Sequence, residues 1–116
     1  MSIPQIFALS VVEIAGDFAF KKFANEGGIK NLSIGILGYI GVIYFLIMSL
    51  QGSSVLLVNA GWDGVSAIIE TLAAYFILGE RLESQVQYFG IVIIIIGLFL
   101  IKIPWKKNKD FTFPDL

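Results

Sequence analysis

Residues 9–22 read LSVVEIAGDFAFKK, an apolar stretch that contains two acids, Glu13 and Asp17. If the apolar run begins near Ile3, Glu13 lies about 15 Å along a helix, close to the middle of a hydrocarbon core about 30 Å thick. A carboxylate at that depth must face protein or water, because its charge is costly in hydrocarbon. Glu13 is therefore a functional candidate, and the alternative is an acid held by a purely structural hydrogen bond.

The composition indicates an integral membrane protein. The chain has 116 residues, of which 57% are hydrophobic and 15% charged, and its mean hydropathy is +0.85. Disorder is excluded, and a water-soluble domain fits poorly. Without cysteine or histidine, proton handling falls to carboxylates, tyrosines or lysines. The net charge of −1 gives no argument for a nucleic-acid partner. No signal peptide is expected, because residues 1–7 lack a basic side chain.

Four apolar segments predict an all-α integral membrane fold with four transmembrane helices and short loops. The helices are expected at about 3–20, 32–50, 55–78 and 86–103, within one domain spanning 1–103 that is followed by a polar tail at 104–116. Each segment is long enough to cross as a helix, whereas open strands would leave backbone groups unpaired in lipid. The expected location is therefore multi-pass, in the plasma (cell inner) membrane.

The segment 55–78 carries a second group of polar residues. At about 100° per residue, five of them fall within one narrow arc of a helix: Asn59, Trp62, Asp63, Ser66 and Glu70. This arc predicts the lining of a cavity or of the bundle interior, with Asp63 and Glu70 beside Trp62 and away from lipid. The alternative is a helix that pairs its polar groups inside a static bundle.

The first segment has a matching stripe. One face is shared by Ser10, Glu13, Gly16, Asp17 and Phe20, and Gly16 is expected to pack against another helix. Glu13 and Asp17 are four residues apart, so they are expected to titrate as a coupled pair. A simpler explanation of Asp17 is an ion pair with Lys21, which follows it by four residues.

Two glycines in the last segment also share a face. Gly90 and Gly97 are seven residues apart and predict either a helix–helix contact or ordinary membrane glycines. No nucleophile with its base, phosphate-binding loop or metal-ligand cluster can be assembled from the sequence. We therefore expect no enzyme activity, no cofactor and no metal.

Several of these residues together resemble the small multidrug resistance family of the drug/metabolite transporters. The resemblance rests on Glu13-x-x-Gly16 with Lys21 or Lys22, Tyr39, Trp62-x-Gly64, Gly79-Glu80-x-Leu82 and Gly90…Gly97. It implies that Glu13 binds protons and substrate in turn, that Trp62 lines the site and that Gly64 packs against a neighbouring helix. It also implies that the last helices join two protomers.

The sequence departs from that family at several positions. Asn59 stands where drug-exporting members have a tyrosine, Ile3 is close to another lost tyrosine, and Ser54 replaces a common proline; Asp17, Asp63 and Glu70 are extra acids. The aromatic surface for a flat hydrophobic cation is thus reduced and negative charge is added, which favours a smaller or more polar cation.

The predicted function is proton-coupled export of a small cationic or amine-bearing compound. Trp62 is expected to offer a cation–π face and Tyr39 a hydroxyl hydrogen bond. The alternatives are a non-transporting membrane scaffold or subunit with the same fold, and a flippase-like subunit for a lipid-linked sugar. The expected partners are the substrate, protons, the lipid bilayer and a second protein copy, as an antiparallel homodimer or paired with a paralogue.

The distribution of basic residues supports an antiparallel pair. One side of the membrane receives Lys21, Lys22, Lys30 and Arg81, and the other receives Lys102, Lys106, Lys107 and Lys109. Because Lys/Arg bias in short loops sets orientation, this balance predicts that both orientations are populated. The alternative is that the tail lysines, clustered near Trp105, fix the termini in the cytoplasm.

One added lysine should therefore decide the orientation. Ser53→Lys, in the turn between the second and third segments, should drive insertion one way, and Asn25→Lys should drive it the other way. Reporters fused to the C-terminus measure the side reached by each variant. Wild-type reporters active on one side only, and unmoved by either lysine, would contradict dual topology.

Overall fold

The computed structural model describes residues 1–106 and 110–116, and it is all-helical over that part of the chain. Its helices are α1 (Ile3–Glu26), α2 (Ile29–Leu50), α3 (Val55–Phe76) and α4 (Gln85–Ile101). The first three are long and apolar enough to cross a membrane, and α4 is shorter, with 17 residues or about 25 Å. The predicted all-α class with four helices is confirmed. Lys107 and Lys109, which belong to the predicted charge balance, lie outside the described residues.

The helix ends differ from those expected from hydropathy. α1 continues past Phe20 to Glu26 and is ended by Gly27, whose φ of 73° suits a residue without a side chain. α2 begins at Ile29 rather than 32, α3 ends at Phe76 rather than 78, and α4 spans 85–101 rather than 86–103. The reason is physical: loss of hydropathy marks where a helix leaves the hydrocarbon, whereas the helix itself ends where the backbone changes conformation.

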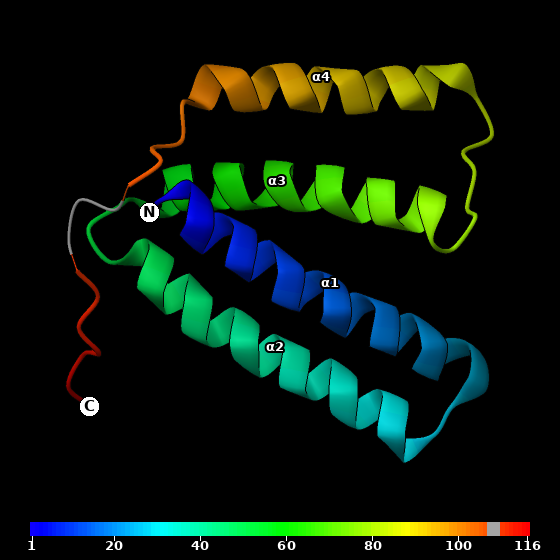
Figure 1. Ribbon diagram of the computed structural model, residues 1–116, viewed down its shortest axis with the longest axis horizontal. Helices are drawn as coiled ribbons and strands as arrows, with labels where there is room; N and C mark the ends of the chain where they lie inside the picture. The colour runs from blue at the N-terminus through cyan, green and yellow to red at the C-terminus, as the bar shows by residue number, and fades with distance from the viewer. Residues whose placement is uncertain (107–109) are drawn as a thin grey trace.

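The helices lie in the spatial order α2, α1, α3, α4, which is not their order in the chain (Figure 1). α1 packs against both α2 and α3, whereas α4 packs against α3 and contacts neither α1 nor α2. α1 and α3 lie close at the N-terminal edge and separate towards the edge that carries the α1–α2 and α3–α4 loops (Figure 1). The result is a slab of 41 × 37 × 18 Å with α1 at its centre.

The two ends of the helical domain are joined at one edge. The backbone N–H of Ile3 donates to the carbonyl of Pro104 at 2.8 Å, which ties the start of α1 to the chain after α4. The tail contacts the end of α2 at this edge. Gln51 exchanges two hydrogen bonds with the backbone of Thr112, and Phe111 lies edge-on to Tyr44. The α2–α3 turn is therefore held by the tail.

The apolar core lies near the same edge and is small. Its buried side chains are Met1, Ile6, Leu9, Val42 and Val58. α4 contributes no buried residue, and most of its apolar side chains are exposed in the single chain. Those side chains are suited to contact lipid or another protein, which agrees with an integral membrane protein.

A glycine stripe brings α1 and α2 into close contact. A Cβ atom on Gly38 would lie 2.8 Å from the Cα atom of Gly16 and 3.0 Å from the carbonyl oxygen of Val12, so the two backbones touch. Gly35 and Gly41, three residues to either side, face Phe20 and Val12 in the same interface. The spacing of three residues was visible in the sequence, but its partner helix was not.

The glycines of the last two helices behave differently. A Cβ atom on Gly64 would collide with the side chain of Leu98, so Gly64 lets α4 approach α3. Gly90 and Gly97 face open space, with no atom of the described chain within 4 Å of an added Cβ atom. Within one chain these two glycines therefore make no helix–helix contact.

Gly38→Ala should destabilise the protein by about 1–3 kcal/mol, because neither backbone at this contact can move aside without separating the helices. Gly41→Ala is the matched control on the same face, since its Cβ atom would meet only the Val12 side chain at 3.3 Å. We expect it to cost less than about 1 kcal/mol, helped by the higher helix propensity of alanine. Reversible unfolding of the purified protein in detergent measures both, and equal effects would argue against the backbone contact.

Candidate functional site

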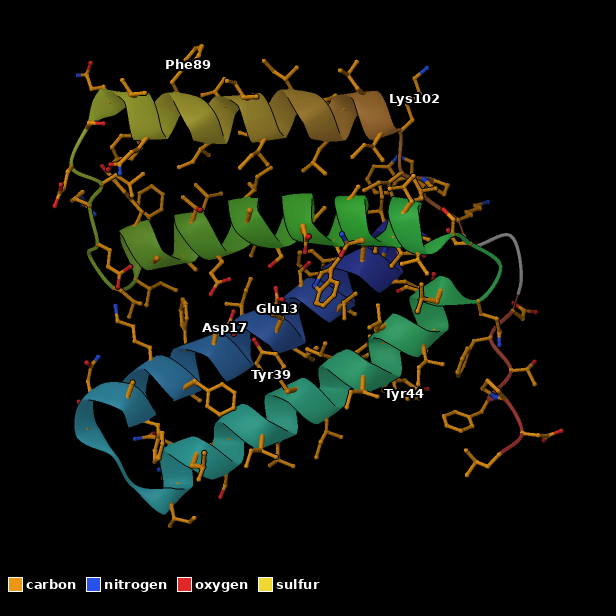
Figure 2. All side chains as sticks on the ribbon, turned by 180° about the vertical axis from the view of Figure 1, so that it is seen from behind. Glu13, Asp17, Tyr39, Tyr44, Phe89 and Lys102 are labelled. Carbon is orange, nitrogen blue, oxygen red and sulfur yellow. The ribbon has the colours of Figure 1, made fainter. Side chains whose placement is uncertain are left out.

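Three carboxylates meet between the two central helices. Glu13 and Asp17 come from successive turns of α1 and Glu70 comes from α3, and one oxygen from each lies within 4.8 Å of the others. We call these three residues the carboxylate cluster. Figure 2 shows Glu13 and Asp17 in the middle of the bundle, with Tyr39 of α2 beside them. The sequence placed Glu13 and Asp17 on one helix face and Glu70 on a face of another helix, and in the structure these two faces contact each other.

Two hydroxyl groups fix the orientation of the cluster. Ser66 of α3 donates a hydrogen bond to Oε1 of Glu13, and Tyr39 of α2 donates one to Oδ1 of Asp17. Ser66 is 6% exposed, so its bond lies inside the protein. Glu13 is thereby tied to α3 and Asp17 to α2, with α1 carrying both.

The position of Tyr39 depends on its neighbours on α1. Its ring lies 5.5 Å from the ring of Phe20, measured between centroids. A Cβ atom on Gly16 would come within 2.8 Å of the Tyr39 ring, so a glycine is needed to leave room for it. Gly16 and Phe20, one turn apart, therefore form the surface on which the tyrosine rests.

A cavity of about 330 Å³ leads from the cluster towards the loop edge. Asp17 and Glu70 are part of its wall, and so are Lys21 and Glu80, which form an ion pair. The expectation that Lys21 pairs with Asp17 is corrected here: Asp17 accepts from Tyr39, and Lys21 reaches across to the α3–α4 loop. The sequence could not show this, because the loop's position depends on how α3 packs.

The remaining predicted site residues do not join the cluster in the single chain. Asn59 and Asp63 are exposed, although they share the helical arc of Ser66 and Glu70. Trp62 packs against the apolar core that contains Leu9 and Val58. Its indole Nε1 is buried and has no hydrogen-bond partner among the described residues.

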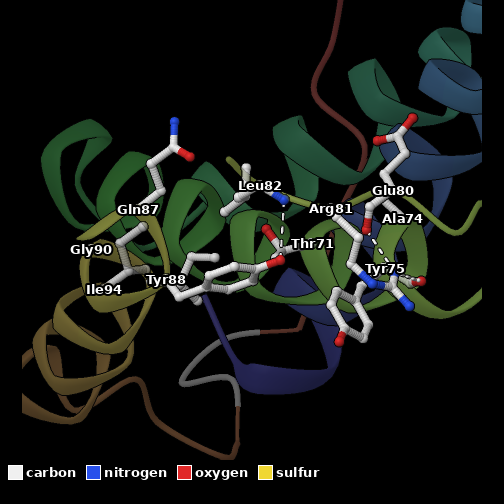
Figure 3. A pocket seen from close by; sticks show the side chains of 11 residues that line it. Thr71, Ala74, Tyr75, Glu80, Arg81, Leu82, Gln87, Tyr88, Gly90 and Ile94 are labelled. Atoms are coloured by element: carbon white, nitrogen blue, oxygen red, sulfur yellow. Dashed lines mark hydrogen bonds between the residues drawn. The ribbon is translucent and has the colours of Figure 1, made fainter. Parts of the chain in front are cut away.

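A second cavity, of about 560 Å³, lies between α3 and α4 next to the loop that joins them (Figure 3). The guanidinium of Arg81 sits 3.6 Å above the Tyr75 ring and donates to the Tyr75 carbonyl at 2.9 Å. The hydroxyl of Tyr88 accepts from the backbone of Leu82 at 3.1 Å. Sequence reasoning did not identify this cavity, because the sequence does not show that the loop carrying Arg81 folds back on Tyr75.

The chemistry available at the cluster follows from its charge. Three acids converge, and two of them, Asp17 and Glu70, line the cavity together with Lys21, which is engaged by Glu80. A buried carboxylate is costly when charged and unpaired, so the cluster needs protons or a cation. Oxygen ligands from three carboxylates also suit a hard divalent cation, which the sequence pattern had not suggested.

The fold and the cluster define a class: a four-helix integral membrane protein with acids on its two central helices. No family model matches the chain, and no solved structure matches it. The chain is similar to three relatives named "Putative ethidium bromide resistance protein", from Escherichia coli, Salmonella typhimurium and Pseudomonas aeruginosa. Each is 28% identical over 100 residues, covering 85% of this chain and 86% of the relative.

Ser66→Ala should lower the free energy of unfolding by roughly 1–3 kcal/mol, because the half-buried Glu13 carboxyl group loses its hydrogen-bond donor. Ser49→Ala is the matched control, since Ser49 is also buried but its hydroxyl donates to the Phe45 carbonyl of its own helix. We expect the control to lose less than about 1 kcal/mol, because that carbonyl retains its helical hydrogen bond. Unfolding in detergent compares the two, and a larger loss in the control would contradict the assignment.

Proposed function

We propose that the protein is a membrane transporter of the drug-resistance type, which exports a small cationic or amine-bearing compound in exchange for protons. The observation that carries the proposal is the carboxylate cluster on α1 and α3. The similarity to relatives named for ethidium bromide resistance supports it. Neither Cys nor His is present to provide an alternative proton carrier.

The exchange follows from mutual exclusion at one site. A cation that binds Glu13 and Asp17 replaces the protons that otherwise neutralise them, so binding on one side of the membrane releases protons. Protonation from the other side displaces the cation and resets the site. Ser66 and Tyr39 keep the carboxyl groups in place through both states, because a hydroxyl can donate to or accept from a carboxyl group.

The cavity favours a small cation over a flat aromatic one. Its volume of about 330 Å³ is at the lower end of the range for ligand sites. Among the described residues that line it, Phe18 is the one aromatic residue, and Ala67, Thr71 and Ala74 supply small side chains. Trp62 lies in the apolar core rather than in this lining.

We further propose that two copies form the working unit, as an antiparallel homodimer or with a paralogue. α4 offers an exposed apolar surface, and no atom of the described residues lies within 4 Å of a Cβ atom added to Gly97, whereas Gly90 borders the cavity between α3 and α4. Asn59 and Asp63, exposed in the single chain, would gain a polar environment beside a second copy. A second copy would also add its own Glu13 to the centre.

A divalent metal ion is a second candidate for the transported cation. The specific observation is that three carboxylate oxygens lie within 4.8 Å of one another, as ligands of a hard cation do. Uptake of radioactive manganese or calcium, measured beside that of an organic cation, separates the two candidates.

Glu13→Gln should abolish gradient-driven transport. The measurement is uptake of radiolabelled tetraethylammonium into proteoliposomes with an imposed pH gradient; the variant should take up no more than the wild type does without a gradient. Glu26→Gln is the matched control, because Glu26 is an exposed acid at the end of the same helix, and it should transport normally. Full gradient-driven uptake by Glu13→Gln would refute the mechanism.

A further inference from the structure

The ion pair between Lys21 and Glu80 is the feature that the proposed exchange does not explain. Lys21 lies one helical turn beyond Asp17 on α1, at the spacing where opposite charges pair along a helix. Both residues line the same cavity as Glu70. Nevertheless, the Lys21 ammonium contacts the carboxylate of Glu80, which belongs to the loop after α3.

We propose that Lys21 is an internal competitor for the cation site, and that Glu80 is the positioning residue that holds its ammonium away from Asp17 and Glu70. The inference rests on the proposed function, since a competitor requires a cation site. It assigns to Glu80 a role in substrate affinity without contact between Glu80 and the bound cation.

The loop that carries Glu80 is fixed so that its carboxylate stays available. The backbone N–H of Glu80 donates to the Ala74 carbonyl at 3.1 Å, which folds the loop back on α3. Arg81, the adjacent cation, stacks on Tyr75 and donates to the carbonyls of Tyr75 and Glu80 rather than to the Glu80 carboxylate. Figure 3 shows Glu80 and Arg81 beside the end of α3. The Glu80 carboxylate is thereby left for Lys21.

The pair's energetics favour a positional role over a stabilising one. The two side chains are 49% and 47% exposed, and ion pairs in such surroundings contribute little to folding. Asp17 and Glu70 are less exposed, so an ammonium that reached them would interact more strongly, in a less polar environment. Without the Glu80 carboxylate, the Lys21 ammonium would therefore pair with Asp17 or Glu70 and occupy the site of the transported cation.

Four proteins test this: the wild type, Glu80→Gln, Lys21→Gln and the double variant, each as the full chain in liposomes. The measured quantity is the Kd for tetraethylammonium. We expect Glu80→Gln to raise the Kd about tenfold or more, and Lys21→Gln to leave it unchanged or lower it. The double variant should match Lys21→Gln, because Glu80 acts only through Lys21. Glu83→Gln, a neighbouring exposed loop acid, is the matched control and should bind as the wild type does.

Three results would overturn the inference. If Glu80→Gln weakens binding equally with and without Lys21, Glu80 acts on the cation directly. If both single variants and the double variant lose affinity alike, the pair is only a structural link. If the wild type binds and Glu80→Gln is unchanged, Lys21 does not compete. A wild type that binds no tetraethylammonium, divalent manganese or calcium would instead count against the proposed function.

Cross-linking with a water-soluble carbodiimide gives a readout that does not depend on transport. This reagent joins an amine to a carboxylate that touches it, and mass spectrometry of the digest locates the product. The wild type should yield the Lys21–Glu80 product, and Glu80→Gln should yield Lys21 joined to Asp17 or Glu70. A Glu80→Gln protein in which Lys21 joins neither acid would overturn the inference, even if cation binding had fallen.

Discussion

A carboxyl group in the middle of a membrane-spanning helix must find its hydrogen-bond donors on other helices, because the lipid offers none. Glu13 finds Ser66 on α3, and Asp17 finds Tyr39 on α2. Each bond joins a different neighbour to α1, so the acids determine which helices flank it. The two hydrogen bonds thus link α1 to α2 on one side and to α3 on the other.

The two flanking interfaces use different means. Between α1 and α2 the contact is close and made by backbones, with Gly38 against Gly16, and dispersion forces act over many atoms. Between α1 and α3 the helices diverge towards the loops, and the space between them is a cavity lined in part by charged side chains. A close interface on one side thus holds α1 firmly, while the wider one on the other side leaves room for a small ligand.

The sequence predicted the residues on each helix face better than it predicted the partners of those faces. Periodicity placed Glu13 with Asp17, and Ser66 with Glu70, because side-chain directions repeat every 3.6 residues. It did not reveal that α1 lies between α2 and α3, so the partners of Lys21 and Gly38 could not be inferred. Asp63 shares the predicted arc yet is exposed, because Ser66 and Glu70, further along α3, are the residues of that arc that meet the acids of α1.

The distance along the chain between Glu13 and Ser66 has a consequence for biosynthesis. The two residues are 53 positions apart, so the acid leaves the ribosome well before its donor does. During that interval α1 and α2 can join through their glycines, and Tyr39 can already serve Asp17, but Glu13 lacks its donor on α3. The early hairpin therefore has to keep Glu13 protonated, or within the insertion machinery, until α3 arrives. The surroundings of Glu13 are therefore complete only after α3 has entered the membrane.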